Sequence, residues 1–302
     1  MSRFGGKSSS LTNRVAPLVF ITPALLLILL TCVVPFSYSV YLSFQKYNLM
    51  MPSSTIHFIG LDNYKTMLSN DMFRSSVGWT LMFTVVAVSV EIVLGMIMAL
   101  ILNNVLIESS SSIFKTLLLI PMMVGGALQA TIWTIMYSPV FGIINNILQL
   151  LGFKAVNWTA QTGPARFAII IVDVWQATAF IMLVFMAALK TVPTELYEAA
   201  YIDGARRGRV FFKITLPLIR NFIALVVSIR VMDALRMFEI PYMLTNGGPG
   251  VSTETIGTAI YKTAFRYFDI GAGSAGGILF FLLIATVIVA SLKIMRKDTS
   301  EY

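Results

Sequence analysis

The chain is very poor in the residues that build thiol and imidazole chemistry. Cys32 and His57 are each the only residue of their kind among 302 residues. A single cysteine excludes an intramolecular disulfide and a thiol metal cluster, and a single histidine argues against a His-based metal site or catalytic triad. Because no nucleophile, base and orienting group fall together on one membrane face, we expect neither an enzyme nor a bound metal or cofactor.

Charged residues are also scarce. They make up 12% of the chain, against about 25% in soluble proteins, while 57% of the residues are hydrophobic and the mean hydropathy is +0.81. This composition places the chain in a bilayer. The net charge of +8 does not indicate nucleic-acid binding, since no basic groove with interleaved aromatic residues is present.

The apolar stretches predict six membrane-spanning helices, because each needs roughly 20 mostly apolar residues. The fifth is the least regular, since Arg230, Asp233, Arg236 and Glu239 interrupt it. Six crossings with both termini in the cytoplasm give the inner segments roughly twice as many Lys and Arg residues as the outer ones, in accord with the positive-inside rule. The expected spans are 15–44, 77–102, 113–137, 165–190, 218–244 and 271–295.

A polar, strongly basic loop at 191–217 separates the fourth and fifth expected spans. Thr194 is suited to cap a short helix that ends at Gly204, and Glu195 and Glu198 complement its positive N-terminal dipole. An inner loop kept basic only to orient the protein would have a similar composition. The small residues of this helix nevertheless favour a surface that another protein approaches closely.

The same loop carries a spaced motif, E-A-A, three residues, G, nine residues, I-x-L-P. This pattern resembles the cytoplasmic coupling loop of the inner-membrane subunits of binding-protein-dependent ABC importers. The matching positions are Glu198, Ala199, Ala200, Gly204, Ile214, Leu216 and Pro217.

The resemblance implies an all-α integral membrane protein of the ABC importer type I permease fold, with a cytoplasmic coupling helix. It divides the chain into a cytoplasmic tail at 1–14, a six-helix permease domain at 15–295 that includes the loop 191–217, and a cytoplasmic tail at 296–302. The cellular location that it implies is the cytoplasmic membrane of a bacterium or archaeon. The coupling residues that it implies are Glu198, Ala199, Ala200, Asp203, Gly204, Leu216 and Pro217.

The resemblance also implies partners. These are a second, similar permease subunit in a heterodimeric pore, two copies of an ATPase that hold ATP and Mg, an extracytoplasmic solute-binding protein or lipoprotein, and membrane lipid. A homodimeric pore stays open. This chain itself is expected to bind no nucleotide and to carry out no bond-breaking step.

Two further segments narrow the resemblance to the carbohydrate uptake class, which includes permeases for maltose, trehalose and glycerol 3-phosphate. One runs from Leu244 to Pro249 and continues through Thr253–Thr255 and Ile260–Phe265; the other is Phe58–Tyr64. The implied solute is a sugar, and we favour a neutral disaccharide or short oligosaccharide. An anionic sugar derivative, such as a uronate or glycerol 3-phosphate, is the alternative, and a proton-coupled secondary transporter is a more remote one.

Polar residues at membrane depth usually face a wet cavity or a paired neighbour. Arg230, Asp233 and Met237 share one helix face, and segments like these line the solute site in the resembling family. Arg230 with Asp233, or Arg236 with Glu239, could equally form ion pairs that fix helix packing. For Glu91, which is the only charged residue of the second expected span, such a packing role is the favoured interpretation. The candidate solute-binding residues are Asp173, Gln176, Phe180, Arg230, Asp233, Met237, Met122 and Gln129.

Overall fold

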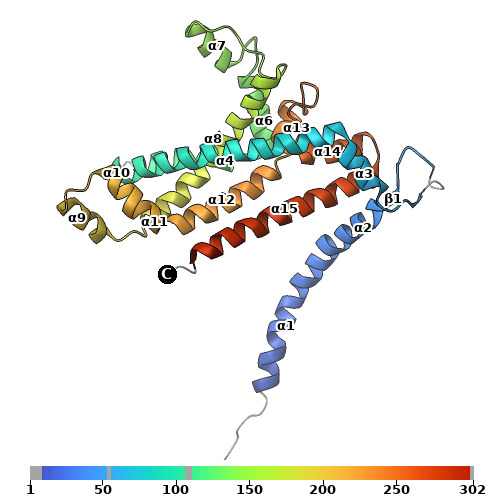
Figure 1. Cartoon of the computed structure of the whole chain (residues 1–302), viewed down its shortest axis with the longest axis horizontal. Coiled ribbons are helices and arrows are strands. Elements are labelled where there is room, and N and C mark those ends of the chain that lie inside the picture. Colours follow the sequence, from blue (N-terminus) through green and yellow to red (C-terminus); the bar gives the residue numbers. More distant parts are fainter. Residues whose placement is uncertain (1–8, 53–55, 106–110, 300–302) are drawn as a thin grey trace, which may run out of the picture. The chain divides into compact units, whose positions relative to one another are not determined.

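The structure is a computed structural model that describes residues 9–52, 56–105 and 111–299. Helices dominate it, and the one small sheet pairs β1 (Gln45–Lys46) with β2 (His57–Phe58) in antiparallel register. The expected tails at 1–14 and 296–302 lie partly outside the described residues. Their described parts are helical, because the first and last helices extend further than their apolar cores (Figure 1).

Long helices lie close to all six expected spans. Among the described residues, four helices are long and apolar enough to cross a membrane alone, and two bent pairs raise the number to six if each pair is one span. The stretches are α1 (Ser9–Ile28) with η1 (Leu29–Val33) and α2 (Val34–Ser43); α4 (Asp71–Val105); α5 (Ser111–Met123) with α6 (Gly126–Met136); α8 (Thr162–Leu189); α12 (Arg220–Leu235) with α13 (Glu239–Leu244); and α15 (Ile270–Thr299).

Short elements connect these stretches. They are α3 (Asp62–Ser69), α7 (Ile143–Leu150), α9 (Thr194–Ile202), α10 (Arg207–Val210), η3 (Phe211–Thr215), α11 (Leu216–Leu218), α14 (Ile256–Tyr261) and η4 (Lys262–Arg266). The chain forms two compact units, one of 1–67 with 263–279 and one of 68–262 with 280–302.

The larger unit is built on α4 and α8, which pack along each other, with α5 and α12 against them. Two apolar clusters form its core. One surrounds Phe83 and Ile169 and the other surrounds Phe185 and Ile181, all of them completely buried. Because α4, α8 and α12 share these clusters, polar side chains on their facing surfaces are brought together inside the unit.

The third expected span is broken, which the prediction of one helix over 113–137 missed. The axes of its two halves differ by 103°, and Gly125 between them has an extended backbone. The Gln129 amide is completely buried and donates to the carbonyls of Pro121 and Val124. These bonds satisfy carbonyls that the break leaves without helical partners.

The fifth expected span is also irregular. Residues 207–218 and 220–244 differ in direction by 68°, and the helix stops after Leu235 before it resumes at Glu239. The Thr255 hydroxyl donates to the carbonyl of Met237 in this gap at 3.0 Å. The single helix expected at 218–244 is therefore wrong in detail, because a neighbouring segment supplies hydrogen bonds that the helix lacks.

Candidate functional site

Arg230 on α12 lies at the centre of a buried ion cluster. Its Nε and Nη2 donate to the two carboxylate oxygens of Glu91 on α4 at 2.8 and 3.0 Å, and Nη2 also donates to Asp173 Oδ2 on α8 at 3.0 Å. Glu91 is completely buried. One guanidinium group thus joins α4, α8 and α12, and both carboxylate oxygens of Glu91 accept a hydrogen bond from it.

The charges continue toward solvent along α12. Asp233 lies 4.0 Å from Arg230 Nη1 and accepts a 2.8 Å hydrogen bond from Arg236 Nη2. Asp233 and Arg236 are both exposed, so this outer pair contributes little to stability compared with the buried cluster.

The structure decides among the ion pairs that the sequence left open. Glu91 takes part in an ion pair between helices, as favoured from the sequence, and its partner is Arg230. The closest partners of Arg230 are on other helices, and Asp233 lies further away, at 4.0 Å. Arg236 pairs with Asp233, and no ion pair between Arg236 and Glu239 occurs among the described residues. A carboxylate in the middle of an apolar helix needs a cation. The position of Glu91 in such a helix therefore indicated that it has a basic partner on another helix.

A cavity of about 380 Å³ opens beside the ion cluster. Five predicted solute residues line it, and the wall is completed by residues around the two helix breaks. The predicted ones are Asp173, Gln176, Arg230, Asp233 and Met237. The others are Gly126, Arg236, Phe238, Glu239 and Ile240.

Three predicted solute residues do not line this cavity. Phe180 packs against the core around Phe185, Met122 is exposed, and Gln129 holds the break between α5 and α6. The sequence missed Phe238 and Glu239 as wall residues, because a continuous helix would have pointed them away from the face of Arg230, Asp233 and Met237. Ile240 was also missed, although it shares that face at helical spacing.

The helix α9 (Thr194–Ile202) projects from one end of the larger unit, between the end of α8 and the start of α12 (Figure 1). Gly204 follows it with φ +73°, and the Ala205 amide donates back to the Ala200 carbonyl at 2.9 Å, which is the expected glycine-terminated end. The Tyr197 hydroxyl contacts the Thr215 hydroxyl at 3.1 Å, so α9 is tied to the start of the fifth stretch.

Most of the expected coupling residues face outward. Glu198, Ala199, Asp203, Gly204 and Pro217 are exposed, Leu216 is partly buried, and Ala200 is buried. The expected cap was wrong by one residue, because Thr194 is the first helical residue and Pro193 precedes it without a side-chain hydrogen bond.

Comparison with known families decides what kind of protein carries these features. The model of the family "binding-protein-dependent transport system inner membrane component" matches residues 91–300.

The chain belongs to this family.

The permease has relatives along nearly its whole length. It is 38% identical to the trehalose/maltose transport system permease protein MalF of Thermococcus litoralis, over 96% of this chain and 97% of that protein. It is 34% identical to the sulfoquinovosyl glycerol transport system permease protein SmoG of Agrobacterium fabrum, over 95% and 92%. It is 32% identical to the trehalose transport system permease protein SugA of Mycobacterium tuberculosis, over 96% and 92%.

Solved structures confirm the expected type I permease fold. The permease matches a chain of a bacterial alginate ABC transporter, in complex with an alginate pentasaccharide-bound periplasmic protein, with a TM-score of 0.84. The identity is 23%, and the match covers 97% of this chain and 99% of that one. The permease is thus a multi-pass membrane component of a transporter.

The segment from Leu244 to Lys262, which carried the sugar-class resemblance, is held by a buried ion pair. Lys262 Nζ lies 2.6 Å from Glu254 Oε2 and donates to the Asn246 carbonyl at 2.7 Å. Gly247 has φ +78°, and a Cβ there would collide with the Glu254 carboxylate. The glycine of this motif is therefore required by the ion pair beneath it.

We expect Lys262→Met to destabilise the permease by about 3–5 kcal/mol, because the completely buried carboxylate of Glu254 loses its cation. The matched control is Lys65→Met, which breaks the exposed pair between Lys65 and Asp62 and should cost less than about 1 kcal/mol. Thermal unfolding of the purified complex measures both. Equal small shifts would show that the Glu254 pair does not hold the segment.

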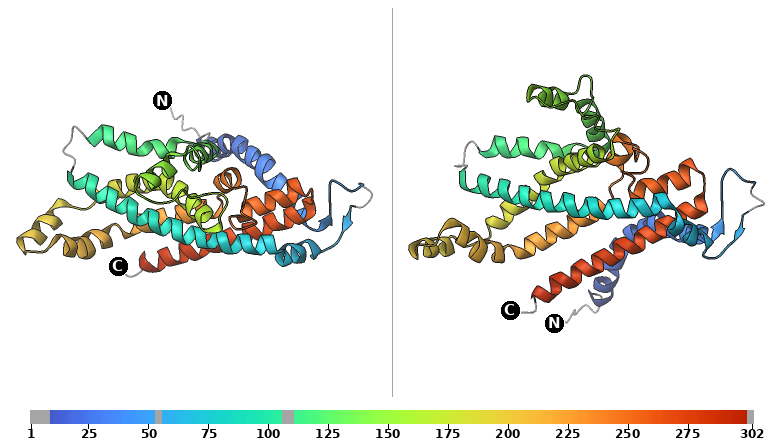
Figure 2. Two further views of the ribbon diagram at one scale, coloured as in Figure 1. Left: turned by 90° about the horizontal axis from the view of Figure 1, so that it is seen from above. Right: turned by 45° about the horizontal axis from the view of Figure 1, so that its top comes forward.

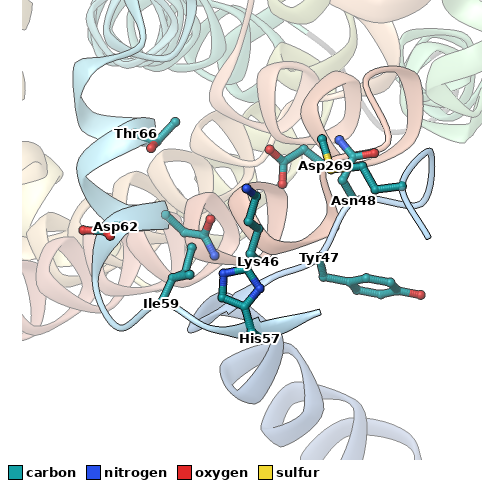
Figure 3. Close-up of a pocket in the computed structure, with 10 residues that line it drawn as sticks. Lys46, Tyr47, Asn48, His57, Ile59, Asp62, Thr66 and Asp269 are labelled. Atoms are coloured by element: carbon teal, nitrogen blue, oxygen red, sulfur yellow. The ribbon is translucent and has the colours of Figure 1, made fainter. Parts of the chain in front are cut away.

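A second cavity, of about 370 Å³, lies in the smaller unit beside β1 and β2. Figure 3 shows the ammonium of Lys46 and the carboxylate of Asp269 facing the same space, while the ring of Tyr47 points away. The Asn63 amide donates to the carbonyls of Ser43 and Gln45 at 2.9 and 2.8 Å and shapes the floor. Most of the residues that line this cavity belong to the first of the expected outer loops, 45–76.

Proposed function

We propose that this chain is the permease subunit of an ABC importer that carries a sugar into the cytoplasm by ATP-driven alternating access. The observation that carries the proposal is the 38% identity, over nearly both full lengths, to a trehalose/maltose permease. The trehalose permease SugA supports the same solute class. The cavity beside the ion cluster, lined by carboxylates, guanidinium groups and the Gln176 amide, supports a path for such a solute.

The coupling role of α9 is the second part of the proposal. Two copies of a separate ATPase, which hold ATP and Mg, receive the exposed face of α9 in a groove. Closure of the ATPases moves α9 as a rigid body, because Tyr197 and Gly204 fix both of its ends. This chain then carries out no chemistry of its own.

The remaining partners are the third part of the proposal, which the family name and the structural relative in complex with a periplasmic binding protein support. A second permease subunit completes the pore, and a binding protein or lipoprotein delivers the solute to the loops near 45–76 and 245–270. Both termini then lie in the cytoplasm.

The charges of the cavity favour a neutral sugar over an anionic one. Its wall holds the carboxylates of Asp173, Asp233 and Glu239 and the guanidinium groups of Arg230 and Arg236. Arg230 is already neutralised by Glu91 and Asp173, so an anion would meet an excess of negative charge. Opposed carboxylates and an amide such as Gln176 can instead accept and donate hydrogen bonds to sugar hydroxyls.

The test is uptake by the complete transporter in proteoliposomes. We expect ATP-dependent accumulation of labelled trehalose or maltose, with little competition from a glucuronate disaccharide at equal concentration. Uptake that persists without ATP and follows a proton gradient would contradict the importer proposal. Strong competition by the uronate would be consistent with an importer, but it would contradict the proposal that the solute is neutral.

A further inference from the structure

The helix α7, in the loop that joins α6 to α8, has an apolar surface wider than the core requires. Ile144 and Leu148 pack inward against the apolar cluster around Phe83 and Ile169, which also contains Tyr137 and Trp158. Beside them, a second apolar row faces outward at helical spacing. It consists of Ile143, Ile147, Leu150 and Leu151, which are 55%, 50%, 86% and 68% exposed.

The orientation of α7 is fixed by Asn145. This buried side chain donates to the carbonyls of Ser138 and Val156 at 3.2 and 3.1 Å, and its oxygen accepts from the Val156 amide at 2.9 Å. The turn before α7 and the segment after it are therefore fastened to the same residue. Because these bonds hold the helix in one orientation, its outward apolar row stays exposed. The right-hand view of Figure 2 shows this short helix projecting from the long helices of the larger unit.

The helix before α7 in the chain also has an exposed apolar row. On α6, which is half of a candidate span, Leu128, Ile132 and Ile135 form an exposed apolar row at 57%, 38% and 57%. Along the chain, the exposed apolar residues Val140 and Phe141 lie between this row and that of α7. The first turn of α8 begins at Thr162, so both ends of α7 are tied to membrane-crossing segments.

The charge of the segment fits the same environment. Between Ser138 and Gln161 the only ionisable residue is Lys154, which is exposed and follows the exposed Phe153. Asn146 and Gln149 occupy the remaining outward positions of α7. Apolar side chains with a neighbouring cation and an uncharged polar edge are suited to the boundary between acyl chains and phosphate headgroups.

We propose that α7 is an interfacial anchor, which lies in the lipid headgroup region with Ile143, Ile147, Leu150 and Leu151 inserted among the acyl chains. The helix has 8 residues, which is too short to cross a bilayer. It therefore holds the outer end of α6, and with it the break that borders the solute cavity, at the membrane surface.

The test uses single cysteines in a Cys32→Ser background, within the complete transporter in proteoliposomes. Ile147→Cys and Leu150→Cys report the apolar row, and Asn146→Cys and Gln149→Cys are matched controls on the same helix. Each is labelled with an environment-sensitive fluorophore. Quenching is measured with iodide equilibrated on both sides and, separately, with lipids that carry a nitroxide on the acyl chain.

We expect nitroxide lipids to quench the labels at 147 and 150 severalfold more than those at 146 and 149, and iodide to show the reverse order. Strong iodide quenching at all four positions would overturn the proposal in favour of an exposed loop. Protection of 147 and 150 from both quenchers, with photo-crosslinking from position 150 to another protein subunit, would overturn it in favour of a protein interface.

Discussion

Replacing Arg230 by methionine is expected to destabilise the transporter by about 3–5 kcal/mol, because it leaves the buried carboxylates of Glu91 and Asp173 without a cation. For a helical domain of this size, the apparent Tm should fall by on the order of 10 °C. ATP-driven uptake should be lost with it. Thermal unfolding and size-exclusion chromatography of the purified complex measure the first effect.

A charge-balanced variant separates packing from solute binding. The triple replacement Glu91→Gln, Asp173→Asn, Arg230→Met removes all three charges, so most of the lost Tm should return. Asp173 and Arg230 line the cavity, whereas Glu91 is completely buried. Because the triple variant lacks two charged groups of the cavity wall, we expect its uptake to stay at least about tenfold below the unmodified level even though its stability is restored.

Two results would contradict this account. A stable Arg230→Met complex would mean that the cluster does not hold α4, α8 and α12 together. Full uptake by the triple variant would mean that the cluster acts in packing alone and that the solute does not contact Asp173.

Replacing Glu198 by glutamine, together with Gly204 by alanine, is expected to uncouple the permease from its ATPase. Glu198 is exposed and forms no ion pair within the described residues, so its loss should change stability by less than about 0.5 kcal/mol. Gly204 has φ +73°, and a side chain there costs about 1–2 kcal/mol and loosens the end of α9. Solute-stimulated ATP hydrolysis and uptake should both fall by more than about tenfold, because the partner loses both the carboxylate and the rigid helix end.

The matched control is Asp71→Asn, which removes an exposed carboxylate from the first turn of α4. It should leave hydrolysis and uptake unchanged. If the double variant still assembles with the ATPase and imports solute at the unmodified rate, α9 is not the coupling element.

Much of the fold could be predicted from local properties. The length and apolarity of a span are contained in a continuous stretch of chain, so α4, α8 and α15 were found within a few residues of their cores. The end of α9 at Gly204 was found for the same reason, since a left-handed backbone after a helix favours glycine at one position.

The long-range partners could not be predicted. Glu91 and Arg230 are 139 residues apart, and each sits in an apolar helix without a local signal of the other. The gap at 236–238 receives a hydrogen bond from Thr255, which is 18 residues away in the chain.

The sequence by itself therefore determined that this is a membrane protein, which of its segments are long and apolar enough to cross a bilayer, and where a short helix ends at a glycine in the basic loop between two of them. These properties depend on hydropathy, length and spacing within single segments. Only the tertiary structure decided which carboxylates neutralise Arg230, where two spans break, and which residues surround the cavity. Those outcomes depend on satisfying buried charges and backbone groups, and such groups find their partners only when distant helices pack together.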